Sequence, residues 1–512
     1  MDADATDTKT PPLAAREIVA KNPATLEELG RVPVLTEQEV HSAGVRAREA
    51  QPAWNALTFK ERARIIFRAR DLLVERQDEV CRLISSETGK PAVEALTSEV
   101  FPVANLMDYF ARKSRKMLRA EQFSLSVFRN KKSRIQYAPH GVIGIISPWN
   151  YPFSIPMGHV VMGLMAGNAI LLKPSEHSSL VGLQIGKLFE EAGLPSGLLQ
   201  ILTGDGSTGA ALAESRIDKL FFTGSVPTGR KLAESAARRF LPVVLELGGK
   251  DAMIVCGDAP LERTVNGALW GAFNNAGQAC ASVERLYVVK SIAGPFIDGV
   301  VEKVKNLRAG HAGKGEYDVG PLNNARQLEI VSSHVEDAVS HGAQVLTGGR
   351  RIESLPGYFY EPTVLVNVNH SMKIMREETF GPVLPIMTVE DEAEAVRAAN
   401  DSNFGLLASV WTKDIRRGKQ IAARLEAGSV LISDVLYTHG AAETPWFGIK
   451  ESGIGVAHSK HGLREFVRMQ HLNWDRIPLK TNPWWFPYSL KKHRAFQFLL
   501  KALHKWGLKK WI

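Results

Sequence analysis

Cysteine is scarce in this chain of 512 residues, in which Cys81, Cys256 and Cys280 are the only three. Three thiols cannot build the dense disulfide framework of a small secreted domain, so the composition favours a reducing compartment. The acidic and polar start MDADATDTKT does not resemble a secretory signal. We therefore expect a cytoplasmic protein.

Long apolar runs and metal-binding motifs are also missing. No run reaches the ~18–20 apolar residues that a bilayer-spanning helix requires. The most apolar stretch, residues 141–172, is interrupted by prolines and polar residues, which predicts buried strands and a buried helix. The sequence has no CxxC pair, no HExxH and no helix with paired histidines, so we expect no metal site.

Acidic residues are absent from the C-terminal end. From Lys480 onward there are eight Lys and Arg and no Asp or Glu, and the whole chain carries a formal charge of +9. The rest of the chain therefore carries only +1. A nearly neutral body argues against binding of nucleic acid.

The tail at residues 484–512 is basic and amphipathic. Its apolar residues recur every three or four positions: Phe496, Leu499, Leu500, Leu503 and Trp506. Its basic residues Arg494, Lys501, Lys505 and Lys509 recur on another face. This pattern is typical of a helix lying in a membrane interface, and we expect an anionic membrane surface as a partner. Packing on the body, on a partner subunit or over the substrate funnel is the alternative.

The length and the periodicity of the chain predict a multidomain α/β protein. A chain of 512 residues is too long for one compact core. Apolar residues at three-to-four spacing predict helices over residues 36–115. From 141 to 247, apolar strands alternate with helices, which predicts a parallel sheet covered on both faces. A second α/β series runs from 252 to about 455.

Two segments carry the chemistry. VLELGGKDA places Glu246 at the end of an apolar strand, and NNAGQACAS places Cys280 in a small polar turn. A nucleophilic thiol with a nearby base can form and then hydrolyse a thioester. FFTGSVPTGRKLAESAA reads as strand, glycine turn and helix, which predicts a phosphate site at the helix N-terminus. Together these features indicate oxidation of an aldehyde to an acid, with Cys81 and Cys256 as buried inert thiols.

The ordered motifs ISPWNYP, LLKPSE, FFTGS, LELGGK, GQAC, EETFGPV, NFGL and PWFGIKESGIG resemble the NAD(P)-dependent aldehyde dehydrogenase superfamily. The resemblance runs from about residue 20 to about 475. It implies a Rossmann-type cofactor domain, an α/β catalytic domain and a small β-arm for oligomerisation. The expected bounds are 14–122 with 140–247 for NAD binding, 248–456 for catalysis, 123–139 with 466–480 for the arm, and 484–512 for the tail.

The resemblance also assigns the catalytic residues. Cys280 is the expected nucleophile and Glu246 the base that activates water. Asn150 is expected to stabilise the oxyanion with the Cys280 backbone N–H. On spacing alone Asn150 would be a turn residue before Tyr151-Pro152.

Cofactor residues follow from the same resemblance, which implies NAD with NADP as an alternative. Lys173 and Glu176 would contact the adenosine ribose, Gly224 and Ser225 the pyrophosphate, and Glu378 and Phe380 the nicotinamide ribose and ring. The other expected contacts are Ile146, Trp149, Gly206, Gly209, Gly229 and Leu247. The GxGxxG pattern at Gly204, Gly206 and Gly209 is weak evidence by itself, since such a turn also needs glycine for close helix–sheet packing.

The favoured function is oxidation of a hydrophobic, aliphatic aldehyde by a homodimer or homotetramer. A soluble semialdehyde or small-aldehyde dehydrogenase is the alternative. A catalytically silent binding protein of this fold would be expected to lose Cys280, Glu246 or Asn150, and all three are present. An intact Glu246 favours water over coenzyme A as the acyl acceptor.

Overall fold

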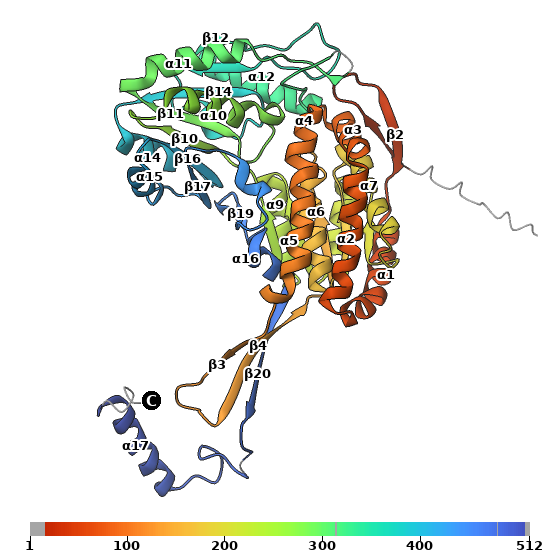
Figure 1. The fold of residues 1–512 in the computed structure, drawn as a ribbon, viewed down its shortest axis with the longest axis vertical. Helices are drawn as coiled ribbons and strands as arrows, with labels where there is room; N and C mark the ends of the chain where they lie inside the picture. The colour runs from red at the N-terminus through yellow and green to blue at the C-terminus, as the bar shows by residue number, and fades with distance from the viewer. Residues whose placement is uncertain (1–15, 313–314, 479, 507–512) are drawn as a thin grey trace, which may run out of the picture. The chain divides into compact units, whose positions relative to one another are not determined.

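The computed structural model describes residues 16–312, 315–478 and 480–506. It divides into two compact units (Figure 1). The larger unit comprises residues 1–114 and 139–466, and the smaller comprises 115–138 and 467–512.

The larger unit begins with a hairpin and a series of helices, as the periodicity predicts. These elements are β1(Glu17–Lys21), β2(Glu28–Pro33), α1(Glu37–Ala56), α2(Phe59–Glu75), α3(Gln77–Thr88), α4(Ala92–Glu94), the π-helical segment η1(Ala95–Val100) and α5(Phe101–Met117). Thr36 and Thr58 begin α1 and α2 with capping boxes, in which Glu39 and Glu61 return a hydrogen bond to the cap. Such boxes satisfy N–H groups that a helix start leaves free.

A six-stranded sheet forms the first α/β layer, with strand order β19-β9-β8-β5-β6-β7. Its strands are β5(Val142–Ile146), β6(Ala169–Lys173), β7(Leu199–Ile201), β8(Lys219–Thr223), β9(Val243–Glu246) and β19(Gly453–Ile454). All pairs are parallel except β19 with β9. The connecting helices are α6(Ser154–Ala166), α7(Ser179–Glu191), α8(Gly206–Glu214) and α9(Val226–Ala237). The predicted parallel sheet is confirmed.

A seven-stranded sheet forms the second layer, in the order β12-β13-β14-β11-β10-β16-β17. Its strands are β10(Asp251–Val255), β11(Val283–Val289), β12(Gln344–Thr347), β13(Thr363–Val366), β14(Val383–Val389), β16(Leu407–Trp411) and β17(Ser429–Ile432). Its helices are α10(Leu261–Phe273), α11(Lys290–Lys305), α12(Ala325–Ser340), α13(Lys373–Arg376), α14(Glu392–Asn400) and α15(Ile415–Ala422).

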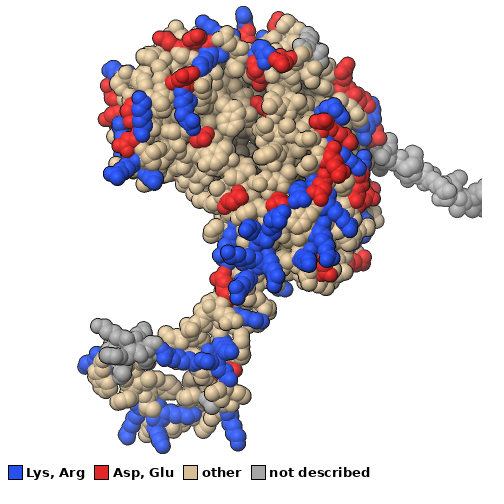
Figure 2. Space-filling model, viewed as in Figure 1, with Lys and Arg blue, Asp and Glu red and all other residues tan. Residues whose placement is uncertain are grey.

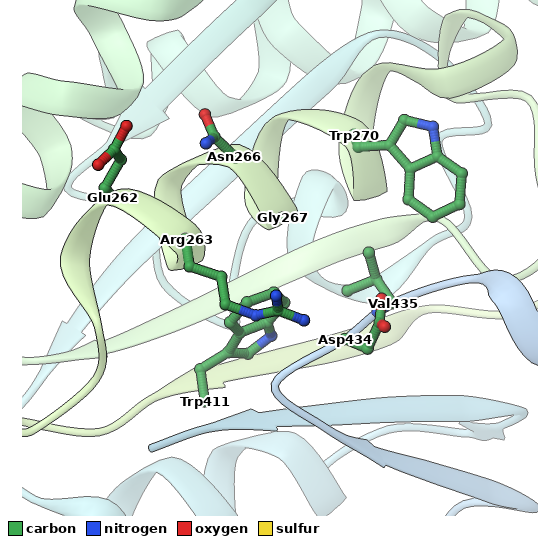
Figure 3. A pocket seen from close by; sticks show the side chains of 8 residues that line it. All are labelled: Glu262, Arg263, Asn266, Gly267, Trp270, Trp411, Asp434 and Val435. Atoms are coloured by element: carbon green, nitrogen blue, oxygen red, sulfur yellow. The ribbon is translucent and has the colours of Figure 1, made fainter. Parts of the chain in front are cut away.

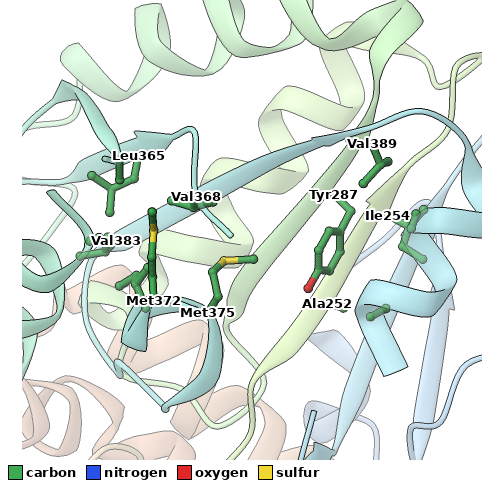
Figure 4. Packing of buried hydrophobic residues seen from close by; sticks show 14 of the residues in the cluster. Ala252, Ile254, Tyr287, Leu365, Val368, Met372, Met375, Val383 and Val389 are labelled. Carbon is green, nitrogen blue, oxygen red and sulfur yellow. The ribbon is translucent and has the colours of Figure 1, made fainter. Parts of the chain in front are cut away.

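Both faces of this second sheet are packed. Figure 4 shows part of one core, in which Tyr287 and Met375 lie among aliphatic side chains of the strands. Residues of α12, α13 and α14 complete that core, whereas α10 and α11 supply the core on the other face. Strands buried on both faces explain the near-continuous apolar runs in the sequence.

The remaining short elements of the larger unit lie in loops. They are η2(Glu176–Ser178), η3(Asn274–Gly277), β15(Phe404–Gly405), η5(Tyr437–Gly440), β18(Ile449–Lys450) and α16(Ser459–Arg464). The seven-stranded sheet begins at Asp251, but β19, which lies within the expected range 248–456, pairs with β9 of the six-stranded sheet, and both sheets belong to one compact unit.

The smaller unit contains a three-stranded antiparallel sheet and one helix. The sheet has the order β20-β4-β3, from β3(Glu121–Phe123), β4(Lys131–Pro139) and β20(Val467–Asp475). Helix α17(Leu490–His504) contains the basic amphipathic pattern. It ends at His504, so the expected apolar stripe loses Trp506, which lies beyond the helix and contacts the Phe498 ring instead. Within the described ranges no helix is long and apolar enough to cross a membrane.

Candidate active site

The candidate residues gather at one edge of the six-stranded sheet. Because β5, β8 and β9 are parallel, their carboxyl ends meet at this edge. Glu246 is the last residue of β9, Thr223 is the last of β8, and Asn150 follows β5 in the next loop. The crevice beyond the carboxyl ends of such strands is where open α/β sheets bind ligands.

The two glycines after Glu246 let the loop approach its neighbours closely. A Cβ at Gly249 would lie 2.2 Å from the backbone oxygen of Cys280, and one at Gly248 would lie 2.5 Å from Oε2 of Glu378. The backbone of Cys280 cannot give way to such a Cβ, so position 249 requires glycine, whereas at 248 the flexible end of Glu378 would have to move. This close approach brings the Glu246 strand end, Cys280 and Glu378 into one site.

Cys280 is the accessible thiol of the chain. It is partly exposed, whereas Cys81 and Cys256 are buried, as expected. Burial raises the pKa of Cys280 well above its ordinary value, and the carboxylates of Asp251 and Glu246 raise it further. In this state the nucleophile is a neutral thiol, and it needs a proton acceptor to become a thiolate.

Glu246 is a second buried acid of the site. It is 7% exposed, and burial raises its pKa to about 8. Its Oε1 atom is buried without a hydrogen-bond partner among the described residues. A carboxylate with a pKa near neutrality is suited to act as a general base. The raised pKa agrees with the burial of Glu246 at the strand end.

Asn150 lies buried beside the thiol loop. Its Nδ2 donates to the carbonyl of Gln278 at 3.1 Å, which uses one of the two amide hydrogens. The second N–H is available for a substrate oxygen. The Asn150 Oδ1 atom is another buried atom for which the described residues supply no partner.

The FTGS turn has the geometry expected of a phosphate site. Ser225 is the N-cap of α9, and its hydroxyl donates to Thr228 Oγ1 at 3.1 Å. Gly229, in the first turn of the helix, packs so tightly that a Cβ would lie 2.5 Å from Leu247. Gly229 and Leu247 thus explain the close approach of α9 to the end of β9, and the helix N-terminus beside Gly224 is the part suited to an anion.

Lys173 and Glu176 lie at the end of β6 and at the start of η2. Lys173 Nζ donates to Glu176 Oε2 at 3.2 Å. Burial acts to raise the pKa of Glu176, but the charge of Lys173 and hydrogen bonds outweigh it, so the pKa is lowered. Glu176 is therefore an anion where a ribose is expected.

The GxGxxG glycines serve different ends. Gly204 has φ +151°, and a Cβ there would lie 1.9 Å from Thr208 Oγ1, so it is a structural glycine. A Cβ added at Gly206 would have no neighbour within 4 Å, and one added at Gly209 would lie 3.7 Å from Cδ1 of Ile146. The last two positions leave room for a ligand beside the end of β5.

Phe380 and Trp149 form an aromatic wall of the site. Their rings meet edge to face with centroids 5.5 Å apart. Phe380 has φ +52°, an unfavourable value for an aromatic residue. Glu378 Oε1 accepts from the Gly249 N–H at 2.9 Å, which ties this loop to the glycine turn.

Sequence reasoning missed the residues that support this wall. Glu284 accepts from the N–H groups of Thr379 and Phe380 at 2.7 and 2.8 Å, and its other contact is the buried Lys250 Nζ at 2.6 Å. Asp251 was missed as a third carboxylate acting on Cys280. The sequence does not show which charged residues are buried. The one available signal was that Lys250 and Asp251 directly follow the LELGG motif.

The strand-end edge fits a nicotinamide dinucleotide. Ser147 Oγ and Thr223 Oγ1 are buried there, and the described chain supplies no partner to either hydroxyl. Buried polar atoms are normally hydrogen-bonded, so these atoms are placed to bind a polar ligand. They lie at the carboxyl ends of β5 and β8, where open α/β sheets bind dinucleotides. A cavity of about 480 Å³ lies elsewhere and is lined by Glu262, Arg263, Asn266, Gly267, Trp270, Trp411, Asp434 and Val435 (Figure 3).

The chain is similar to proteins of one family. The aldehyde dehydrogenase family matches it over residues 12–472. A 4,4'-diapolycopene aldehyde oxidase of Methylomonas sp is 41% identical over 489 residues, covering 95% of this chain and 91% of that protein. A candidate NADP(+) succinate-semialdehyde dehydrogenase of Mycobacterium ulcerans (strain Agy99) is 39% identical, covering 91% of each. The solved NAD+ complex of Bacillus cereus aldehyde dehydrogenase is 33% identical with a TM-score of 0.87, covering 90% of this chain and 94% of that one.

Alkylation should distinguish the three thiols. Iodoacetamide should modify Cys280 before Cys81 and Cys256, because only Cys280 is not fully buried. The thiolate is the reactive form and the pKa of Cys280 is raised, so the rate should increase from pH 7 to pH 9. Peptide mass analysis over time measures each site, with Cys280→Ser as the control. Equal labelling of the three cysteines in folded protein would contradict the structure.

Proposed function

The chain belongs to the aldehyde dehydrogenase family, and we propose that it oxidises a neutral, hydrophobic aldehyde with Cys280 as nucleophile. Membership of this family supports oxidation of an aldehyde with NAD or NADP as cofactor. The observation that supports a hydrophobic substrate is the apolar surrounding of Cys280, which packs against a buried cluster of Ala281, Leu406, Leu407, Leu431, Trp446 and Ala457. Apolar groups gain about 25 cal/mol for each Å² that they remove from water, so an aliphatic aldehyde would be favoured beside this thiol.

The burial around the thiol supports the same substrate class. Burial raises the pKa of Asp251, Glu246 and Glu378 as well as that of Cys280, so the site disfavours negative charge. The carboxylate of a semialdehyde would lose its hydration in such surroundings, which costs free energy. The names of the relatives point both ways, since one oxidises diapolycopene aldehyde and another is a candidate for succinate semialdehyde. A soluble semialdehyde dehydrogenase is therefore the second candidate.

The first chemical step is attack of the Cys280 thiolate on the aldehyde carbon. A C–S bond forms, and the carbonyl oxygen becomes an anion. The free N–H of the Asn150 amide and the Cys280 backbone N–H are the proposed donors to that oxygen. Removal of one such donor typically lowers the rate about 10²–10³-fold, and we expect a loss of this size when the Asn150 amide is removed.

Oxidation and hydrolysis complete the cycle. Collapse of the oxyanion to a carbonyl would release a hydride from the former aldehyde carbon to NAD or NADP, which would leave a thioester on Cys280. Glu246 then takes a proton from water, the hydroxide attacks the thioester, and the carboxylic acid departs as the thiol is restored. The raised pKa of Glu246, about 8, makes it a stronger base than an ordinary carboxylate. The presence of Glu246 favours water over coenzyme A as acceptor, and it argues against a silent binding protein.

Glu246→Gln should separate the two half-reactions. The variant should release one equivalent of NADH per site in a burst and then stall, because acyl transfer to water has lost its base. Rapid-mixing absorbance of NADH measures both phases. Cys280→Ala should show no burst, whereas Cys81→Ala and Cys256→Ala should keep most activity. Unchanged steady-state turnover of Glu246→Gln would rule out the base role.

We propose NAD as the preferred cofactor because of Glu176. Its anionic carboxylate is held by Lys173, where it would accept bonds from ribose hydroxyls and repel a 2′-phosphate. Glu176→Gln should raise the ratio of kcat/KM for NADP over NAD about tenfold, which corresponds to ~1.4 kcal/mol. Glu190→Gln, at an exposed position of α7, is the matched control. A wild-type enzyme that already prefers NADP would contradict this assignment.

We propose that the sheet of the smaller unit mediates a homodimer or homotetramer. β20 and β3 are the two edges of that sheet, and exposed edges pair readily with another chain. Met469 of β20 is 71% exposed, which leaves apolar surface for a partner subunit.

We also propose that the smaller unit brings a cytoplasmic enzyme to anionic membrane. Over the ranges 115–138 and 467–512 the sequence holds 17 Lys and Arg but only two Asp and Glu. Blue side chains accordingly dominate the region of α17 on the face seen in Figure 2. Electrostatics of this kind adds about 1 kcal/mol for each Lys or Arg near an anionic surface.

The apolar side of α17 is open for burial in lipid. Phe496 and Leu499 are each 41% exposed, and Leu500 is 62% exposed. The preceding aromatics Trp485 and Phe486 are 51% and 76% exposed. Apolar contacts of this size would hold the helix at the interface after charge attraction brings it there.

Removal of charge from α17 should release the enzyme from anionic vesicles. The triple variant Arg494→Gln, Lys501→Gln, Lys505→Gln should co-sediment much less than wild type with phosphatidylserine vesicles. Wild-type binding should weaken with salt without vanishing, because burial of apolar side chains is not screened. Turnover of a short soluble aldehyde should be nearly unchanged.

The control variant neutralises three cations of the larger unit, namely Lys60→Gln, Arg64→Gln and Lys305→Gln. These positions are exposed, and their loss should leave vesicle binding unaltered. If wild type stays in the supernatant at low salt, the membrane proposal fails, and packing of the tail on the body or a partner becomes the better interpretation.

A further inference from the structure

A buried ion pair lies directly behind Asn150. Lys90 Nζ donates to Glu99 Oε1 at 2.6 Å, and both side chains are fully buried. Removing two charges from water costs several kcal/mol per ion unless each charge finds strong partners. A fully buried pair such as this one therefore raises the question of which other groups it binds.

The contacts of Lys90 reach the Asn150 backbone. Lys90 Nζ also donates to the Asn150 carbonyl oxygen at 2.8 Å. Asn275 Nδ2 donates to the same oxygen at 3.0 Å. The ammonium lies 4.3 Å from the centre of the Tyr151 ring, so Lys90 contacts both residues of the Asn150-Tyr151 turn.

The contacts of Glu99 fix the other side of the turn. Its Oε2 atom accepts from the backbone N–H groups of Phe153 and Ser154 at 2.8 and 3.1 Å, at the start of α6. Glu99 belongs to the π-helical segment η1, a backbone form that recurs at functional sites. The pair thus connects the turn that holds Asn150 to the first turn of α6.

We propose that Lys90 and Glu99 are positioning residues that hold the Asn150 amide in line with the developing oxyanion. This rests on the proposed role of Asn150. Lys90 fixes the Asn150 backbone, the Gln278 carbonyl fixes one amide hydrogen, and the second hydrogen then has one direction left. A displacement of about 1 Å in such a group can cost about 10²-fold in rate.

A double-mutant cycle tests this coupling. The burst rate of NADH formation is measured in wild type, Lys90→Met, Asn150→Ala and the double variant, each with confirmed NAD binding. Lys90→Met should slow the burst about 10- to 100-fold when Asn150 is present. It should slow the burst less than about threefold in a chain that already carries Asn150→Ala, because residues that act through one another are not additive.

Glu99→Gln gives a second cycle if Lys90→Met does not fold. It removes the charge while an oxygen remains available to the start of α6, and the same non-additivity with Asn150→Ala is expected. Lys219→Met is the matched control, since Lys219 pairs with Glu465 at the opposite, N-terminal end of β8. Lys219→Met should lower thermal stability, but it should change the burst rate by the same factor with and without Asn150→Ala.

Three results would overturn the inference. Equal slowing by Lys90→Met in wild type and in the Asn150→Ala variant would show that the pair serves folding alone. An unchanged burst in Lys90→Met would show that Asn150 is held without it. An unchanged burst in Asn150→Ala would instead refute the proposed oxyanion role itself, and with it the basis of the inference.

Discussion

The close passage of Gly249 over the backbone of Cys280 is the constraint on which the site depends. A Cβ at 249 would lie 2.2 Å from the Cys280 carbonyl oxygen, so only glycine permits the approach. The approach places a thiol and a carboxylate in one dry region, and burial raises the pKa of both. Each is therefore neutral at rest, and a proton must move before the thiol can react. The burial that disfavours the thiolate also disfavours the charged carboxylate of a semialdehyde substrate.

Two buried ion pairs, Lys250–Glu284 and Lys90–Glu99, hold backbone segments near the site. Glu284, paired with Lys250, accepts the backbone N–H groups of Thr379 and Phe380 and so fixes the aromatic wall of the site. The Lys90–Glu99 pair does the same for the turn of Asn150. In both cases a carboxylate accepts from backbone N–H groups, those of a loop for Glu284 and those at the start of α6 for Glu99.

Patterns with a short range were predictable from the sequence. The alternation of apolar strands and helices predicted the parallel sheet, because periodicity is a local property. The sequence also placed Glu246 at a strand end and Cys280 in a turn, as the structure has them, while their catalytic roles stay predictions. The contribution of Lys90 was not predictable, since a lysine after a helix reads as a solvated surface residue and its partner lies nine positions away in a π-helical segment. Trp506 was misplaced because the apolar period continues past His504, where α17 ends.

The central claim is that an acyl group is held on Cys280 until Glu246 activates water. Direct mass analysis of Glu246→Gln, quenched in acid after mixing with aldehyde and NAD, tests it without reliance on rates. The account predicts that the peptide containing Cys280 gains the mass of the aldehyde less two hydrogen atoms, as a thioester requires. NADH formation with no such adduct on Cys280, or with an adduct on Cys81 or Cys256 instead, would contradict the account.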